Sequence, residues 1–163
     1  MGQGGDGVKQ RLEGLNRVLV AVETGAAGGL VAVVAGVVLL QVLMRYLVAQ
    51  PNPWSEEVSR FCFIWMSFLG ASLAVERRAH FRFDETMRRL PPRWRRRVEG
   101  AAWTVVLLFA GLLIVSGALL TALTMGERSP ALDLPVALVY AAAPVSGGLM
   151  VIHLLAGGAG ERR

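Results

Sequence analysis

The sequence has 163 residues, is 54% hydrophobic and has a mean hydropathy of +0.50, so its composition favours one membrane-embedded domain over a soluble one. Its net charge is +5, and every basic residue except Lys9 is an arginine. Because these arginines flank apolar runs, anionic phospholipid headgroups fit better as partners than nucleic acid. Cys62 is the only cysteine, which excludes an intrachain disulfide.

Four apolar runs predict an all-α integral membrane protein with four transmembrane helices. Each run has about the 20 residues that a helix needs to cross the hydrocarbon core of a bilayer. The predicted spans lie at about 18–43, 58–75, 98–123 and 134–156. Together they predict a single four-helix membrane domain over residues 1–163.

The first span carries one acidic residue, Glu23, inside its apolar sequence. A carboxyl group at this depth could relay protons, but it also lies close enough to the end of the span to reach water or to pair with Arg17 or Asn16. We favour the second, structural interpretation. The run is too long for the core of a cleavable signal peptide, and it enters Arg45 without a small-residue cleavage site.

Small residues recur at helical spacing along the first and second spans. In lipid, such stripes let two helices approach each other closely. They are Gly25, Gly28, Gly29, Ala32, Gly36, Gly70 and Ala74. The helix contacts that they predict lie either within the chain or with another subunit.

Charged and aromatic residues cluster around the connection between the first and second spans. The cluster consists of Arg45, Trp54, Glu56, Glu57 and Arg60. On a helix, Arg60 lies four residues after Glu56 and three after Glu57, so either carboxylate can pair with it. We expect these residues to brace the first two helices or to contact a partner subunit, rather than only to anchor the helix ends.

The connection between the second and third spans, residues 76–97, is rich in arginine and interleaved with aromatic residues. This pattern predicts a basic interfacial segment, whereas the alternative is a solvated loop that only fixes topology. The residues expected to bind headgroups are Arg88, Arg89, Arg93, Trp94, Arg95, Arg96 and Arg97. Because the N-terminal segment, this connection and the C-terminal tail hold most of the basic residues, both termini are predicted to be cytoplasmic.

The sequence shows no phosphate-binding loop, metal-ligand cluster or nucleophile–base pair, so an enzyme is disfavoured and no cofactor is predicted. His80 and His153 fall at similar depths and could ligate a haem, although interfacial histidines are the simpler interpretation. Pro144 lies inside the fourth span and is expected to kink it.

Several short motifs stand out between Gln41 and Asp84. They are Gln41-Val42-Leu43-Met44-Arg45-Tyr46, Trp54-Ser55-Glu56-Glu57 followed by Arg60, Trp65 with Phe68-Leu69-Gly70-Ala71, and the exit from His80 to Asp84. In combination they resemble the small membrane subunit of tripartite ATP-independent periplasmic (TRAP) transporters, the DctQ-type family.

The resemblance implies a non-enzymatic small permease subunit in the bacterial inner membrane. Its implied partners are a large multi-span subunit, which moves an organic acid by using a sodium gradient, and a periplasmic solute-binding protein that captures this acid. The small subunit is then expected to act as a membrane scaffold for the large one.

Two other functions stay open at this point. A small proton-coupled multidrug exporter also has four spans and a membrane glutamate, a part that Glu23 could play, but its loops are shorter and its charge bias is weaker. A haem-bearing membrane anchor of a respiratory enzyme would use His153 as a ligand.

Overall fold

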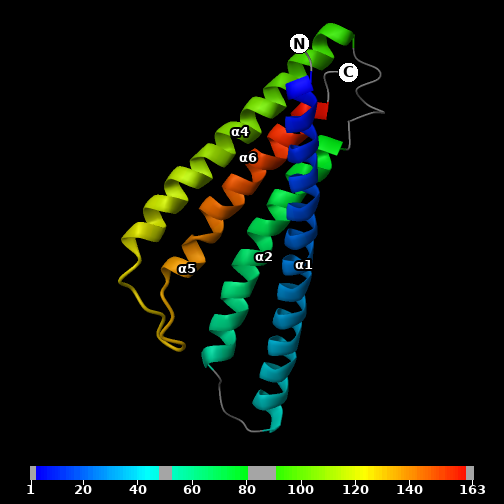
Figure 1. The fold of residues 1–163 in the computed structure, drawn as a ribbon. Coiled ribbons are helices and arrows are strands. Elements are labelled where there is room, and N and C mark those ends of the chain that lie inside the picture. Colours follow the sequence, from blue (N-terminus) through cyan, green and yellow to red (C-terminus); the bar gives the residue numbers. More distant parts are fainter. Residues whose placement is uncertain (1–2, 48–52, 81–90, 161–163) are drawn as a thin grey trace.

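The computed structural model describes residues 3–47, 53–80 and 91–160, and within these ranges the chain is almost entirely helical (Figure 1). The helices are α1 (Gln3–Leu47), α2 (Pro53–His80), α4 (Pro92–Leu123), the short α5 (Ala137–Tyr140) and α6 (Ala142–Gly160). In the described ranges, four stretches are long and apolar enough to cross a membrane, namely Gly14–Leu47, Pro53–Arg77, Arg97–Leu123 and Ala137–Gly157. The predicted all-α class with four membrane helices is confirmed.

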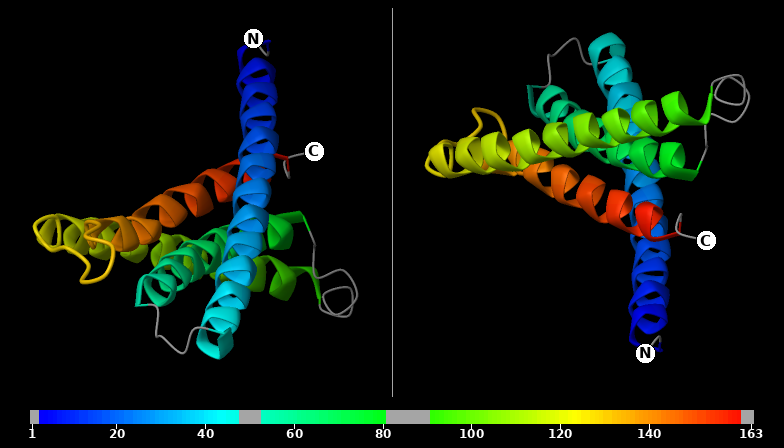
Figure 2. Two further views of the ribbon diagram at one scale, coloured as in Figure 1. Left: turned by 90° about the horizontal axis from the view of Figure 1, so that it is seen from below. Right: turned by 90° about the horizontal axis from the view of Figure 1, so that it is seen from above.

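Helix α6 lies between α2 and α4, and α1 packs on α2 and crosses α6 obliquely (Figures 1 and 2). The N-terminal end of α1, the C-terminal end of α6, the end of α2 and the start of α4 lie at one end of the bundle, which we call the inner end. The α4–α5 loop and the start of α2 lie at the opposite, outer end. The arginine distribution predicts that the inner end faces the cytoplasm.

The side of α1 that faces the bundle follows a regular spacing of four and three residues. Its positions are Asn16, Val20, Glu23, Ala27, Leu30, Val34, Val37 and Gln41, all of them buried or half-buried. This spacing places one side chain per turn on a single stripe, as in a coiled coil. Among the α1 residues whose side-chain exposure is described, only Asn16 and Glu23 are buried, and the rest are half-buried or exposed.

Two glycines that the sequence did not single out allow α4 and α6 to pack closely. A Cβ atom at Gly117 would lie 2.5 Å from Cδ of Pro144, and one at Gly147 would lie 2.9 Å from the carbonyl oxygen of Ala110. By contrast, a Cβ atom on any of the five predicted packing glycines would meet nothing within 4 Å in the described chain. These are Gly25, Gly28, Gly29, Gly36 and Gly70, and the predicted packing alanines Ala32 and Ala74 are also exposed.

The fourth membrane element is broken near Pro144, where α5 ends at Tyr140 and α6 begins at Ala142. Proline has no N–H group to donate to the carbonyl four residues earlier, so the helix cannot continue regularly. In lipid, backbone groups released by such a break need other partners. The carbonyl that Pro144 leaves without its helical donor is that of Tyr140. Two residues earlier, the carbonyl oxygen of Leu138 accepts the indole Nε1–H of Trp65 on α2 at 3.0 Å.

Candidate functional site: polar clusters at the two ends of the bundle

The α4–α5 loop at the outer end is tightly folded. The Arg128 guanidinium donates to the carbonyl oxygen of Asp133 at 2.9 Å and to its carboxylate at 3.3 Å, and an isolated bridge pairs Arg128 with Pro135. Ser129 donates its N–H to the carbonyl of Leu134 at 2.9 Å. Asp133 has a φ of 54°, which is uncommon for a residue other than glycine and marks a sharp reversal of the chain. These bonds give the loop a defined shape.

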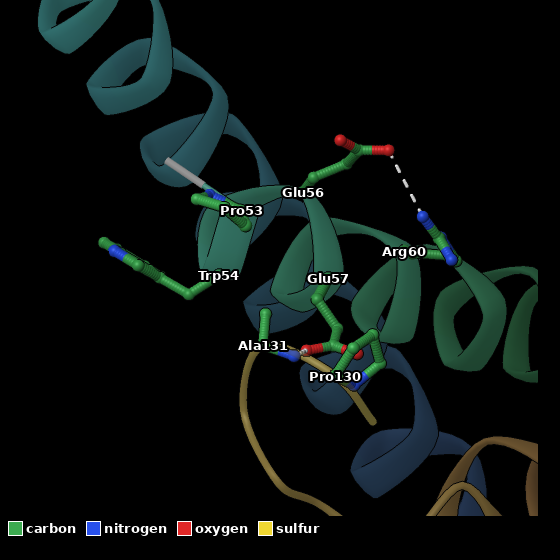
Figure 3. Close-up of a pocket in the computed structure, with 7 residues that line it drawn as sticks. All are labelled: Pro53, Trp54, Glu56, Glu57, Arg60, Pro130 and Ala131. Atoms are coloured by element: carbon green, nitrogen blue, oxygen red, sulfur yellow. Dashed lines mark hydrogen bonds and ion pairs between the residues drawn. The ribbon is translucent and has the colours of Figure 1, made fainter. Parts of the chain in front are cut away.

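Glu57 fastens this loop to α2 (Figure 3). One oxygen, Oε2, accepts the backbone N–H of Leu132 at 2.8 Å and that of Ala131 at 3.2 Å, and the residue is only 7% exposed. Hydrogen bonds from neutral donors to a carboxylate are about twice as strong as neutral ones. We call Glu57, Ala131 and Leu132 the outer clamp. It joins α2 to the loop after α4, whereas we expected Glu57 to brace the first two helices or to contact a partner subunit.

The other residues of the predicted outer cluster lie on the surface. Arg60 pairs with Glu56 at 3.2 Å, one of the two pairings that the helical spacing allows, and both side chains are more than 60% exposed. Arg45 lies in the last turn of α1 and is exposed. Trp54 is 37% exposed. The structure therefore divides the predicted cluster into one internal clamp residue and four surface residues.

An open pocket of about 430 Å³ lies beside the outer clamp (Figure 3). It is lined by Pro53, Trp54, Glu56, Glu57, Arg60, Pro130 and Ala131. Figure 3 shows that Glu57 points toward Pro130 and Ala131, whereas Glu56 and Arg60 project from another side of α2. The pocket thus combines a proline and tryptophan rim with an exposed ion pair.

A second polar cluster lies near the inner end, between α1 and α6. His153 Nδ1 lies 2.6 Å from Oδ1 of Asn16, and His153 Nε2 lies 2.8 Å from Oε1 of Glu23. All three residues are buried: Asn16 is 8% exposed, Glu23 3% and His153 1%. We call them the inner cluster.

The inner cluster corrects two predictions. We expected Glu23 to reach water or to pair with Arg17 or Asn16, and His153 to be an interfacial histidine; both are instead buried and bonded to each other. One signal was available, because Asn16 and Glu23 are seven residues apart and therefore share a helix face. Since Asn16 and Glu23 occupy both ring nitrogens of His153, neither nitrogen is available to a haem iron.

The start of α4 carries the described part of the predicted lipid-anchoring set. Arg93, Trp94 and Arg97 are exposed there, and the Arg97 guanidinium lies 5.5 Å from the centre of the Trp94 ring, within range of a cation–π interaction. Arg88 and Arg89 lie outside the described residues. Arg95 and Arg96 lie in α4, but their side chains are not among those described. The assignment of these residues to lipid headgroups stays a prediction.

This architecture defines a small multi-pass membrane protein, and in the part of the chain that the structure describes no group of three or more His, Cys, Asp or Glu residues could hold a metal ion. Residues 34–158 match the family described as tripartite ATP-independent periplasmic transporters, DctQ component. Because this match covers most of the sequence, the chain belongs to the DctQ family of TRAP transporter small membrane subunits, which are multi-pass proteins of the bacterial inner membrane.

Individual relatives agree with this assignment. The chain is 35% identical over 147 residues to the isethionate TRAP transporter permease protein DctMQ of Oleidesulfovibrio alaskensis. The aligned region covers 83% of this chain but only 22% of that relative, which is much longer. The chain is 29% identical over 126 residues to a putative TRAP transporter small permease protein of Haemophilus influenzae, covering 77% of this chain and 78% of the relative. It is 28% identical over 106 residues to the sialic acid TRAP transporter small permease protein SiaQ of Vibrio cholerae, covering 65% and 61%. These relatives are transporter permease subunits, which are not enzymes.

Proposed function

We propose that this chain is the small permease subunit that scaffolds the large membrane subunit of a TRAP transporter, for sodium-driven uptake of an organic acid captured by a periplasmic binding protein. Both termini are cytoplasmic in this proposal. The supporting observation is that the buried charged side chains described here, Glu57 and Glu23, both bond to other parts of the same chain. Such a use of charge suits a rigid support better than a solute path.

The large subunit is proposed to dock on the side of α1 that faces away from the bundle. Gly25, Gly29, Ala32 and Gly36 each follow a residue of the inward stripe by two positions. Two positions correspond to about 200° around a helix, so these four lie on the opposite side of α1. All four are exposed in the isolated chain. Small residues let a neighbouring helix approach closely in lipid, where packing drives helix association.

The exposed side of α4 differs from that of α1. Its exposed positions include large aliphatic side chains, such as Leu108 (69% exposed), Val115 (70%) and Leu123 (68%). Bulky aliphatic residues suit contact with fluid lipid tails, whereas glycines leave shallow grooves that another helix can fill. On α1 the small residues occupy the middle of the outward stripe, between the large exposed side chains of Val22 (62%) and Leu39 (61%). This stretch of small residues supports the middle of α1 as the face that meets the large subunit.

The docking face can be tested by filling it. Gly29→Leu and Gly36→Leu should reduce co-purification of the large subunit several-fold, because the added side chains hold the partner helix away from α1. Gly100→Leu on α4 is the matched control, since Gly100 is also exposed and also meets nothing within 4 Å. Equal recovery of the large subunit with all three variants would contradict the proposal.

The exposed outer residues Arg45, Trp54, Glu56 and Arg60 are then left as candidate contacts for the partner subunits. The inner end would be held at the lipid surface by Arg93, Trp94 and Arg97, with Arg88, Arg89, Arg95 and Arg96 in the same segment. Arginines and tryptophan at this position fit anionic headgroups and the interfacial layer. Replacing Arg93 and Arg97 with glutamine should weaken binding of anionic lipid to the purified subunit.

Uptake in proteoliposomes would test the whole assignment. The chain, the large subunit and the binding protein should together accumulate an organic acid when a sodium gradient is imposed, and omission of this chain should abolish uptake. The names of relatives supply isethionate, sialic acid and C4-dicarboxylates as first solutes to try. Equal uptake without the chain would refute the scaffold role.

A further inference from the structure

The attachment of α1 to α6 depends on polar side chains. Asn16 and Glu23 are the only buried residues of α1 among those whose exposure is described, and both bond to His153. The apolar positions on the same stripe, such as Leu30 and Val34, are only half-buried. In a bilayer, apolar side chains gain little by exchanging lipid tails for another apolar surface, whereas an unpaired polar group is costly. The inner cluster is therefore the polar attachment of α1 to α6, in addition to the packing of α1 on α2.

Hydrogen-bond chemistry gives the number of protons in this cluster. The Oδ1 atom of Asn16 can only accept, so the Nδ1 atom of His153 carries a hydrogen. The contact of 2.8 Å between Nε2 and the Glu23 carboxylate also requires a hydrogen between its two atoms. That hydrogen lies either on Nε2, giving a charged pair, or on Glu23, giving a neutral one. In both cases the cluster as a whole has no net charge.

The alternative arrangement is less favourable. If the Asn16 amide were turned round, its NH₂ group would donate to Nδ1, and a neutral His153 would donate from Nε2 to an ionised Glu23. This would bury a carboxylate without a compensating charge, which carries a large desolvation penalty. The penalty would be increased by the second oxygen of Glu23, Oε2, which is buried and has no hydrogen-bond partner in the described structure.

We propose that Asn16, Glu23 and His153 form a buried site that binds one proton and thereby fixes α1 to α6. This inference concerns the isolated chain and does not depend on the proposed transport role. The shared proton removes the net charge from the interface between the two helices, so the cluster can remain out of water without another counter-ion.

Other ionisable groups lie at the same end of the helices that surround the cluster. Among described side chains they are Arg11 and Arg17 on α1, Glu76 and Arg77 on α2, and Arg93, Arg97 and Glu99 on α4. Glu76 and Glu99 have interaction partners of their own. Arg17 is exposed, so it can be replaced by glutamine as a control for long-range charge effects.

A double-mutant cycle on the full-length chain in detergent tests the coupling. Glu23→Leu and His153→Leu should each lower the thermal unfolding midpoint, on the order of 5 °C, because each leaves a buried polar partner unpaired. The double variant should lose clearly less than the sum of the two single losses. The exposed pair Glu56 and Arg60 provides a matched control cycle, in which we expect small shifts of the unfolding midpoint and little coupling between the two substitutions. Additive losses at Glu23 and His153 would overturn the proposal.

The proton assignment has its own test in the unmodified protein. Nitrogen-15 NMR of histidine-labelled chain, with a His80→Gln variant to assign the two residues, should show that Nδ1 of His153 is protonated. If His153 instead carries a hydrogen only on Nε2, the Glu23 carboxylate is ionised and faces a neutral ring, as in the alternative arrangement. That result would overturn the proton assignment. This measurement also decides the question if the leucine variants fail to fold.

Discussion

Removal of the Glu57 carboxylate should release the α4–α5 loop from α2. Two backbone N–H groups converge on one oxygen at 2.8 Å and 3.2 Å, and hydrogen bonds to charged groups contribute about 1.5–3 kcal/mol each. Ala131 is exposed and Leu132 is half-buried, so water can replace part of what Glu57→Ala removes. We therefore expect the variant to lose about 2 kcal/mol of loop stability, less than the sum of two such bonds.

Glu57→Gln separates charge from geometry. Because both N–H groups bond to the same oxygen, the single carbonyl oxygen of glutamine can take its place. Only the charge assistance is lost, which is about half of the bond strength. For Glu57→Ala, a loss of about 2 kcal/mol corresponds to roughly 30-fold faster exchange of the loop amides. For Glu57→Gln, a loss of about 1 kcal/mol corresponds to roughly 5-fold faster exchange.

Hydrogen exchange at Ala131 and Leu132, followed by mass spectrometry or NMR, is the direct assay. Glu56→Ala serves as the control, because Glu56 lies one residue away but is exposed and does not bond to the loop. Exchange in Glu57→Ala that equals the wild-type rate would refute the clamp. Exchange in Glu57→Gln that equals the rate in Glu57→Ala would show that charge, rather than the shape of the acceptor, holds the loop.

Three further predictions follow from the packing. Arg60→Ala should change the free energy of unfolding by less than about 1 kcal/mol, measured by thermal unfolding, because its ion pair with Glu56 is largely exposed. Gly117→Ala should lower the free energy of unfolding by about 1–3 kcal/mol, because it forces a Cβ atom against Pro144. Gly148→Ala should be tolerated in the same assay, because its Cβ atom would meet nothing within 4 Å. Trp65→Phe should cost about 1 kcal/mol by removing the donor to the Leu138 carbonyl, and a matched Trp103→Phe variant should not have this loss.

Local features of the fold could be predicted from the sequence. Membrane spans are read from continuous apolar runs, because the thickness of the bilayer fixes their length. The pair formed by Glu56 and Arg60 is also local, since one helical turn separates the two residues. The interruption near Pro144 follows from the chemistry of one residue.

The partners of the buried charges could not be predicted in the same way. Glu57 bonds to residues 74 and 75 positions later, and Glu23 bonds to a histidine 130 positions later. The local sequence around Glu57 favours Arg60, because helical spacing brings these two side chains near each other. For Glu23 it favours Arg17 or Asn16, because these polar residues lie at the nearer end of the span. Only the packing of α1 on α6, and of the loop on α2, brings the actual partners within reach. The same holds for Gly117, whose role depends on Pro144 on another helix.

The outer clamp and the inner cluster hold different helices at opposite ends of the bundle (Figure 1). The inner cluster attaches α1 to α6, and the outer clamp attaches α2 to the loop between α4 and α5. Because the two share no residue, the thermal losses of Glu57→Ala and His153→Leu should add if each end is held independently. A combined loss well below the sum would mean that release of one end already loosens the other. For the proposed scaffold role, additive losses would mean that loosening the outer end leaves the attachment at the inner end intact.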